Sequence, residues 1–261
     1  MTSLLSEKKS KTNTCDECGA TVEPHEVEIL GRTKVIRGTC KCVQEKWIKE
    51  EAERLRKSQV ESIKKLFDHS RVGERFADCT FENWQETPGT KLAYAEAKDF
   101  IACFDDRLAK GDGLLFYGPV GTGKSHLAAA IVNALILERR SAIFQSVPEL
   151  LSRLRATYSD RAKEREATLL RALEVAELVV LDDIGAEKWS EWVEEKLYSI
   201  IDSRYRAKKP LIITSNLTLD EMNKAVGFRA MDRLIEMCRL VEVKGESFRR
   251  QKARQRMKRI K

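Results

Sequence analysis

The sequence lacks both a long apolar run and a leader-like start. No window contains the roughly 18 consecutive apolar residues that a membrane span requires. The most apolar stretch, residues 127–137, is interrupted by Asn133 and followed by three charged residues. The first 14 residues contain no apolar segment followed by a small-residue cleavage site, so the pattern of a secretory signal is absent. We therefore expect a soluble, cytoplasmic protein that has no membrane partner.

The cysteine pattern argues against a disulfide framework, because seven is an odd number and nothing indicates secretion. Four of the seven lie in the first 42 residues as Cys15-x-x-Cys18 and Cys40-x-Cys42. Four thiolates at such spacing predict a structural Zn²⁺ site, and the metal would largely fold so short and core-poor a segment. Two alternatives stay open: reduced free thiols, or His25 in place of one cysteine, because the second pair has a single intervening residue. A closed four-ligand site favours binding over catalysis. The remaining cysteines are expected to be core thiols: Cys79, Cys103 and Cys238.

Positive charge is concentrated at the end of the chain. The net charge is +7, and residues 249–261 hold eight basic residues and no acid. The rest of the chain is nearly neutral, with 40 basic against 41 acidic residues. Such a block indicates an anionic partner, most often nucleic acid, and the alternative is a solvated helix end that serves solubility.

The chain is predicted to fold as four segments. These are a small cysteine-rich module over residues 1–42, a charged helical linker over 43–71, a larger domain over 72–248 and a basic tail over 249–261. Short apolar strands alternate with helices from about residue 75, which predicts an α/β domain with a mostly parallel sheet. The predicted strands are residues 114–117, 142–145, 178–181, 211–214 and 240–243, and two of the predicted helices are 125–138 and 191–206.

The motif GPVGTGKS, residues 118–125, predicts a phosphate-binding loop between a strand and a helix. Glycines let successive backbone N–H groups turn toward a phosphate at the helix N-terminus. Lys124 would reach the β- and γ-phosphates of ATP, and the Ser125 hydroxyl would bind Mg²⁺. The predicted nucleotide-binding residues here are Gly118, Pro119, Val120, Gly121, Thr122, Gly123, Lys124, Ser125 and His126.

Two further strand ends carry polar groups that suit this chemistry. The strand at 178–181 is followed by Asp182 and Asp183, and ligands bind at the carboxyl ends of strands in α/β sheets. Asp182 would hold Mg²⁺, and Asp183 would orient or deprotonate the attacking water. Taken alone, the pair would more often begin a turn, because Ile184 and Gly185 follow, but the P-loop favours the Mg²⁺ role. On the next strand, Thr214 or Asn216 would sense the γ-phosphate or place the water, unless they serve only turn chemistry.

Together these segments resemble the AAA+ ATPases of the DnaC/DnaI helicase-loader and IstB group over residues 72–250. The resemblance rests on GPVGTGKSHLAAA, LVVLDDIGAE and LIITSNLT, and on ERFADCTFENW upstream. It implies a five-stranded sheet with the P-loop strand near the middle. It also implies that Asn216 is the first sensor, that Arg233 is an arginine finger with Arg229 as a second candidate, and that Arg249 is the second sensor. Asp183 departs from the wider AAA+ pattern, in which Glu is usual.

The resemblance implies an ATP-hydrolysing loader of a replicative hexameric helicase that assembles as an ATP-dependent oligomer on single-stranded DNA. An arginine finger acts on a neighbour's γ-phosphate, so that role for Arg233 requires self-association. The alternative is a surface arginine paired with Asp232 or Glu236. Residues 153–165, which carry basic side chains and Tyr158, are a candidate DNA contact or a solvated helix face. Two other functions remain open: an IstB-type transposition helper on duplex DNA, and an ATP-gated adaptor with little turnover.

Overall fold

The computed structural model describes residues 13–29, 32–36, 38–67, 74–159, 162, 164–186 and 189–258. The chain divides into two compact units, Met1–Ser58 and Gln59–Lys261. In the described part of the chain, no helix is long and apolar enough to cross a membrane.

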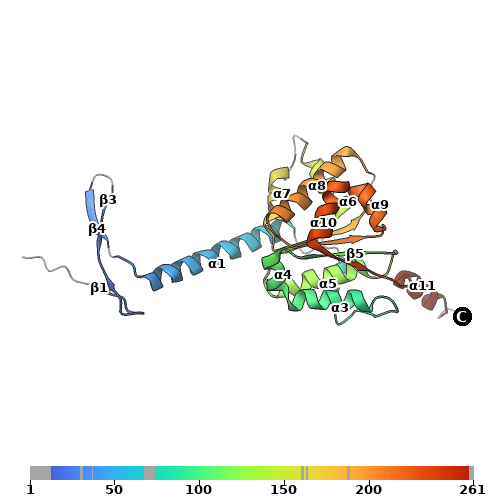
Figure 1. Ribbon diagram of the computed structural model, residues 1–261, viewed down its shortest axis with the longest axis horizontal. Coiled ribbons are helices and arrows are strands. Elements are labelled where there is room, and N and C mark those ends of the chain that lie inside the picture. Colours follow the sequence, from blue (N-terminus) through green and yellow to red (C-terminus); the bar gives the residue numbers. More distant parts are fainter. Residues whose placement is uncertain are drawn as a thin grey trace, which may run out of the picture. The chain divides into compact units, whose positions relative to one another are not determined.

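The first unit consists of two small antiparallel hairpins and most of a long helix (Figure 1). Strand β1 (Asn13–Thr14) pairs with β2 (Thr21–Val22), and β3 (His25–Ile29) pairs with β4 (Arg32–Ile36). Helix α1 (Lys41–Leu66) follows. Among the described residues of this unit, the buried core consists of Cys15, Val22 and Cys40. So small a cluster buries little apolar surface, and this burial alone would not stabilise the unit. The cysteines must therefore stabilise it through bonds of their own as well as through packing.

The second unit is built on a five-stranded parallel sheet with the strand order β6-β7-β8-β5-β9. The predicted strands are confirmed as β5 (Gly113–Tyr117), β6 (Ala142–Ser146), β7 (Leu178–Ile184), β8 (Leu211–Ser215) and β9 (Cys238–Glu242). The P-loop strand β5 lies inside the sheet between β8 and β9, one place from the edge. The four strands other than β9 are buried almost throughout, which explains their unbroken apolar sequences.

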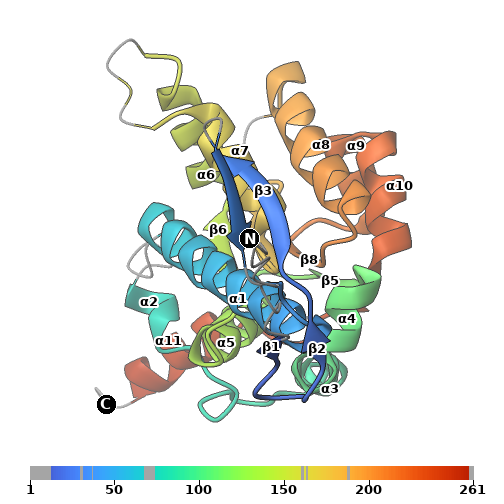
Figure 2. The ribbon, with the colours of Figure 1, turned by 90° about the vertical axis from the view of Figure 1, so that its left-hand side faces the viewer.

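Helices cover both faces of this sheet, so the unit has three layers (Figure 2). One face packs against α3 (Lys91–Ala102), α4 (Phe104–Lys110) and α5 (Lys124–Leu137). The other packs against α6 (Val147–Ala156), α7 (Glu166–Val175), α8 (Glu191–Arg206), α9 (Leu219–Val226) and α10 (Phe228–Met237). Alternate strand residues separate into the two cores: Leu114 and Phe116 face the first, and Leu115 faces the second.

Three further segments complete the unit. The short helix α2 (Glu74–Ala77) leads through an irregular stretch to α3, and α11 (Phe248–Lys258) ends the described chain. The last turns of α1 also belong here, since Ile63 and Phe67 are buried in the second core.

The expectation of three core thiols is wrong for one of them. Cys79 and Cys238 are buried, but Cys103 is exposed. The backbone of Cys103 leaves the helical region between α3 and α4. Its side chain therefore lies at a helix junction rather than on the apolar face of either helix.

Candidate functional site

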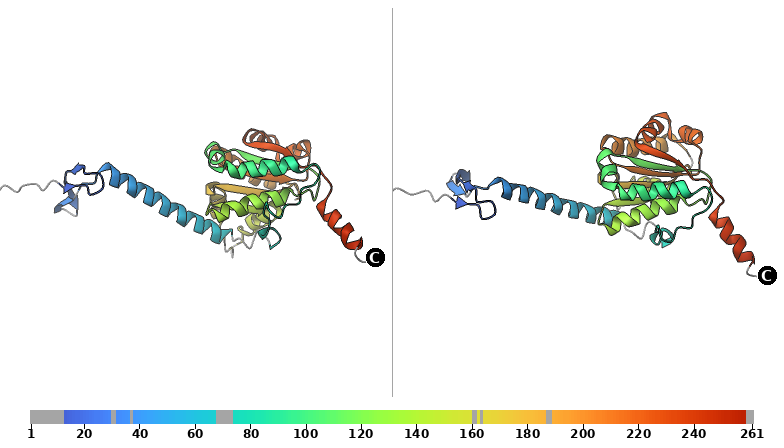
Figure 3. Two further views of the ribbon diagram at one scale, coloured as in Figure 1. Left: turned by 90° about the horizontal axis from the view of Figure 1, so that it is seen from below. Right: turned by 60° about the horizontal axis from the view of Figure 1, so that its bottom comes forward.

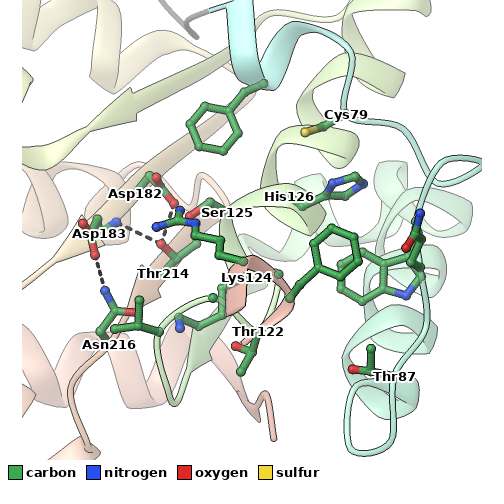
Figure 4. A pocket seen from close by; sticks show the side chains of 18 of the residues that line it. Cys79, Thr87, Thr122, Lys124, Ser125, His126, Asp182, Asp183, Thr214 and Asn216 are labelled. Atoms are coloured by element: carbon green, nitrogen blue, oxygen red, sulfur yellow. Dashed lines mark hydrogen bonds between the residues drawn. The ribbon is translucent and has the colours of Figure 1, made fainter. Parts of the chain in front are cut away.

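A cavity of about 720 Å³ lies at the carboxyl ends of the sheet strands. Figure 4 shows Ser125, Asp182 and Thr214 close together on one side of this pocket, with Cys79 and Thr87 on the other. Its walls come from the loop after β5, from the ends of β6, β7 and β8, from the segment before α3, and from the start of α11. The site is therefore assembled from segments that are far apart in the sequence.

The loop after β5 has the backbone that a phosphate cradle needs. Gly118, Gly121 and Gly123 all have positive φ, between 84° and 131°, a region that other residues rarely adopt. At Gly123 a Cβ would also lie 2.5 Å from the indole of Trp84, so the loop could not pack here with any larger residue. The glycines therefore allow both the curl of the loop and its contact with the wall beside it.

Lys124 is folded back onto its own loop. Its Nζ donates hydrogen bonds to the carbonyl oxygens of Gly118, at 2.8 Å, and Pro119, at 2.7 Å. Burial lowers the pKa of the Lys124 ammonium to about 8, although the carboxylates of Asp183 and Asp182 oppose this effect. A buried cation that has only carbonyl partners is poised to exchange them for phosphate oxygens.

Asp182 and Asp183 both line the pocket, although they are adjacent on one strand. Consecutive residues of a regular strand point to opposite faces. Here the pairing of β7 with β8 shifts register between Leu181 and Ile184, and Asp183 has a left-handed φ of 62°. Such an irregularity re-aims side chains. It explains how two successive carboxylates reach one site.

Thr214 connects these two acids. Its hydroxyl donates a hydrogen bond to Oδ1 of Asp182 at 2.6 Å and accepts one from the backbone N–H of Asp183 at 2.9 Å. Burial raises the pKa of the Asp182 carboxyl, and the hydrogen bonds from Thr214 and Ser125 oppose the shift. The hydroxyl of Thr214 is thus already occupied as donor and acceptor. Asn216 is exposed, and its Nδ2 donates to Oδ1 of Asp183.

The second wall was not identified as part of the site from the sequence. It comes from residues 76–87, between α2 and α3, and includes two aromatic side chains, Phe76 and Trp84. His126, at the start of α5, hydrogen-bonds the carbonyl of Thr80 at 2.9 Å and meets the Trp84 ring edge to face. His126 therefore joins the P-loop helix to this wall. The concentration of aromatics in the segment FADCTFENW was the available signal.

The start of α11 closes the pocket on the side of the P-loop. The backbone N–H of Phe248 donates to the carbonyl of Gly121 at 2.9 Å. Arg249 and Lys252 line the cavity, and the guanidinium of Arg249 is one of the charges that lower the pKa of Lys124. The structure thus brings Arg249 to the site from far along the chain.

Arg233 lies outside this pocket and is held within its own chain. Its Nε donates to Oδ1 of Asp202 at 2.8 Å, and the guanidinium lies over the rings of Tyr198 and Tyr205. The expected alternative partners, Asp232 and Glu236, are not the ones found. The neighbouring Arg229 is exposed and forms no ion pair with any described residue.

The candidate DNA segment is only partly available for binding. Arg153 donates to Glu164, to Gln145 and to the carbonyl of Leu66, so it is a structural residue rather than a free cation. Arg155 stacks over Trp192, and the exposed Tyr158 accepts a hydrogen bond from the same indole. Arg161 and Lys163, also in this segment, lie outside the described residues, as do Arg259 and Lys261 of the tail.

The four N-terminal cysteines form a compact cluster. All four Sγ atoms lie within 4.8 Å of one another, and the sulfur of Cys40 is 3.2 Å from Cys15 and 3.0 Å from Cys42. Four sulfurs around a tetrahedral Zn²⁺ at about 2.3 Å would be about 3.8 Å apart, so the set suits that ion. Hydrogen bonding, first from the backbone N–H of Cys18, lowers the pKa of Cys15 to about 6, whereas side-chain hydrogen bonds with Cys40 and Cys18 raise the pKa of Cys42. The distances between the sulfurs, rather than these opposed shifts, support a metal site. The His25 side chain lies outside what the structure describes.

Comparison with known proteins gives one consistent result. Residues 48–256 match the family of IstB-like ATP binding proteins. The chain is 32% identical to the replicative helicase loader DnaC of Escherichia coli K12 over 180 residues, which cover 69% of this chain and 72% of that protein. The crystal structure of the DnaC helicase loader has a TM-score of 0.59 at 26% identity and covers 66% of this chain and 100% of its own. The crystal structure of DnaI, at 23% identity and a TM-score of 0.55, covers 66% of this chain and 92% of its own and shows the same fold.

Proposed function

This chain belongs to the family of IstB-like ATP binding proteins, and from its similarity to the helicase loader DnaC we propose that it loads a hexameric replicative helicase onto single-stranded DNA. Loading would use ATP bound between subunits of an oligomer, and hydrolysis to ADP and phosphate would release the loader. The observation that carries the proposal is the pocket in which Lys124, Ser125, Asp182 and Asp183 converge, in a chain that is 32% identical to a helicase loader over 180 residues.

The arrangement of the pocket supports a division of roles. The loop from Gly118 to Ser125 would hold the phosphates, and Ser125 with Asp182 would hold Mg²⁺. Asp183 would orient the attacking water, with Asn216 fixing its carboxylate. Mg²⁺ would neutralise charge that develops on the transferred phosphoryl group. Trp84 and Phe76 line the far side of the cavity, where an adenine base would find aromatic surface.

Thr214 is proposed as a positioning residue rather than a phosphate sensor. The residue is only 1% exposed, and its hydroxyl already bridges the carboxylate of Asp182 and the backbone N–H of Asp183. Asn216, which is exposed at the end of β8, suits the sensor role better. Arg249 would contact the γ-phosphate from α11, within the same chain.

The trans-acting arginine is proposed to come from α10. Arg233 must leave Asp202 before it can reach a neighbouring subunit, whereas Arg229 is exposed and unpaired among the described residues. The arginine of one subunit would stabilise negative charge in the next subunit's pocket, so that turnover depends on assembly.

The first unit is proposed to bind the helicase. A Zn²⁺ held by Cys15, Cys18, Cys40 and Cys42 would fix its fold, since its buried core is minimal. The adjoining helix α1 leaves Trp47 60% and Leu55 60% exposed, which is unusual for large apolar side chains and suits a protein partner.

A second function is favoured by the family match itself, which carries the IstB name. That reading makes the chain a transposition helper that acts on duplex DNA. A third is an ATP-gated adaptor with little turnover, because Asp183 is shorter than the usual Glu and its reach to a water is smaller.

Co-elution on size exclusion with the replicative helicase of the same source, with and without ATP, tests the proposal. We expect a stable complex that disappears when residues 1–70 are removed. The matched control removes residues 253–261, none of which lines the nucleotide pocket, and should leave the complex intact. No complex in any nucleotide state would reject the loader function and favour the transposition helper, for which ATP-dependent binding to duplex DNA is the corresponding measurement.

A further inference from the structure

Helix α11 carries two basic stripes with different surroundings. It has six basic residues and no acid in its 11 positions. Residues three, four and seven apart share a face of a helix. Arg249, Lys252 and Arg256 therefore form one stripe, while Arg250 and Arg254 form another on a different face.

The first stripe belongs to the nucleotide pocket. Arg249 and Lys252 both line the cavity, and the helix starts at a direct hydrogen bond from Phe248 to the P-loop carbonyl of Gly121. The contact is tight: a Cβ on Gly121 would lie 2.2 Å from Oγ of Ser247. The P-loop and the N-terminus of α11 must therefore move together.

The second stripe, Arg250 and Arg254, lies on a face turned away from the pocket and forms no strong ion pair with a described residue. Arg250 forms no ion pair with a described residue, and Arg254 has only a 3.7 Å contact with Glu246, both side chains being about 70% exposed. Such a pair contributes little. Figure 3 shows α11 extending beyond the three-layer body of its unit, and residues 252–257 are all exposed.

The chemistry of α11 identifies the class of partner. The helix has no apolar stripe that could dock on a hydrophobic groove, since Met257 is its one large exposed apolar side chain among those described. A dense cationic surface without acids or apolar anchors binds a phosphate backbone, where affinity comes from neutralised charge and released counterions. Single-stranded DNA is the partner that the proposed function supplies.

We propose that α11 couples the two ligands: Arg249 and Lys252 bind the nucleotide phosphates, Arg250 and Arg254 bind the DNA backbone, and the nucleotide thereby fixes the helix for DNA. This inference rests on the proposed nucleotide site and extends it. Without nucleotide, α11 is attached through its first turn, and an isolated helix of 11 residues is marginal. Phosphate contacts at Arg249 and Lys252 immobilise the helix in advance, so DNA binding costs less conformational entropy. By linkage, DNA must raise nucleotide affinity by the same factor.

The test measures fluorescence anisotropy of a labelled oligo(dT), with and without a non-hydrolysable ATP analogue and Mg²⁺, over a range of salt. In the wild type we expect the analogue to raise DNA affinity about tenfold, within the usual range of allosteric coupling. The Arg250→Ala/Arg254→Ala variant should lose DNA affinity in both states and lower the salt slope by about 1.4, at about 0.7 per contact. Its affinity for a fluorescent ATP analogue in the absence of DNA should stay within about twofold of wild type, since neither residue lines the pocket.

Two further variants separate coupling from general charge. In Arg249→Ala/Lys252→Ala the ratio of DNA affinities with and without nucleotide should fall to about one. Arg171→Ala/Lys224→Ala removes the same charge from exposed positions elsewhere and should preserve that ratio. Wild-type DNA affinity in Arg250→Ala/Arg254→Ala, or an unchanged ratio in Arg249→Ala/Lys252→Ala, would overturn the coupling. A wild type that binds no ATP analogue would instead reject the proposed nucleotide site.

Discussion

The side-chain amide of Asn216 donates a 2.6 Å hydrogen bond to Oδ1 of Asp183. Asp183 lies near the end of β7 and Asn216 directly follows the neighbouring parallel strand β8, and the two come together because both strands end at the same edge of the sheet. This bond fixes one carboxylate oxygen of Asp183 and leaves the other for a water. This geometry supports our proposal that Asp183 activates the nucleophile.

Asp183→Asn should abolish ATP turnover, by at least about 100-fold, while ATP affinity changes little. The amide cannot accept a proton, whereas phosphate and Mg²⁺ would still be held by Lys124, Ser125 and Asp182. Phosphate release and ATP-analogue binding measure the two effects, with the exposed Asp220→Asn as control. If helicase loading persists without turnover, ATP acts as a clamp and the adaptor function is the correct one.

Nucleotide affinity should depend on the protonation of Lys124. Its pKa of about 8 in the empty pocket is below that of an unfolded lysine, so raising the pH from 8 to 10.5 removes this proton from the folded chain first. Because the unfolded chain then holds more protons than the folded chain, the free energy of unfolding rises with pH in this window. Loss of the positive charge on Lys124, however, weakens phosphate binding. We expect the Kd for the Mg-bound ATP analogue to rise about tenfold between pH 7 and pH 9.

Lys124→Ala should abolish nucleotide binding and ATP-dependent assembly at every pH. Circular dichroism across the same pH range is the control for folding. A flat pH profile of the wild type would show that the lysine keeps its proton throughout, and unaltered nucleotide affinity in Lys124→Ala would reject the phosphate-site assignment.

Replacing Cys15 and Cys18 together by serine should release the metal and weaken partner binding, but spare the fold of the second unit. Two of four thiolates cannot retain a tetrahedral Zn²⁺. Metal analysis of freshly purified protein provides the measurement. Cys103→Ser, which removes an exposed thiol outside the cluster, should keep full metal content. Wild-type protein without zinc would contradict the assignment.

Mixing variants should identify the arginine that acts on a neighbouring subunit. Lys124→Ala subunits cannot bind ATP but keep Arg229 and Arg233, whereas Arg233→Ala subunits keep an intact pocket. If Arg233 acts in trans, the mixture should recover turnover that neither variant has alone. The same mixture with Arg229→Ala tests the exposed candidate. If turnover recovers with neither arginine variant, neither Arg229 nor Arg233 is the residue that acts on the neighbouring subunit.

Arg204 should be a major determinant of stability. It is 0% exposed, and its guanidinium donates to the backbone carbonyls of Leu173, Glu174, Ala176, Glu177 and Pro210. Burial lowers its pKa to about 9, which still leaves it charged at neutral pH. Arg204→Ala would remove the hydrogen-bond donor that these carbonyls share.

We expect the Arg204→Ala substitution to lower the free energy of unfolding by ~3–5 kcal/mol in urea denaturation. Arg171→Ala, at an exposed i,i+3 pair, should change it by less than about 0.5 kcal/mol. Equal effects of the two substitutions would show that the carbonyls of the α7–β7 and α8–β8 connections find other partners.

Local signals in the sequence determined the strands, the P-loop and the cysteine cluster. Each is a short-range pattern: apolar runs bounded by polar residues, glycines at fixed offsets before Lys124, and paired cysteines close enough along the chain to meet. The alternation of strands and helices likewise required the parallel, three-layer fold, because parallel strands need crossover connections.

Only the tertiary structure decided what those elements bring together. The aromatics of FADCTFENW are a local signal, but only packing places residues 76–87 opposite the P-loop as the second wall. No local pattern indicates that Arg204 and Arg153 are internal structural residues or that Cys103 is exposed. The sequence places Asp182 and Asp183 side by side, but regular strand geometry would send them to opposite faces. The bulge against β8 and the left-handed backbone of Asp183 bring both to the pocket, and these arise from packing between strands that lie far apart in the chain.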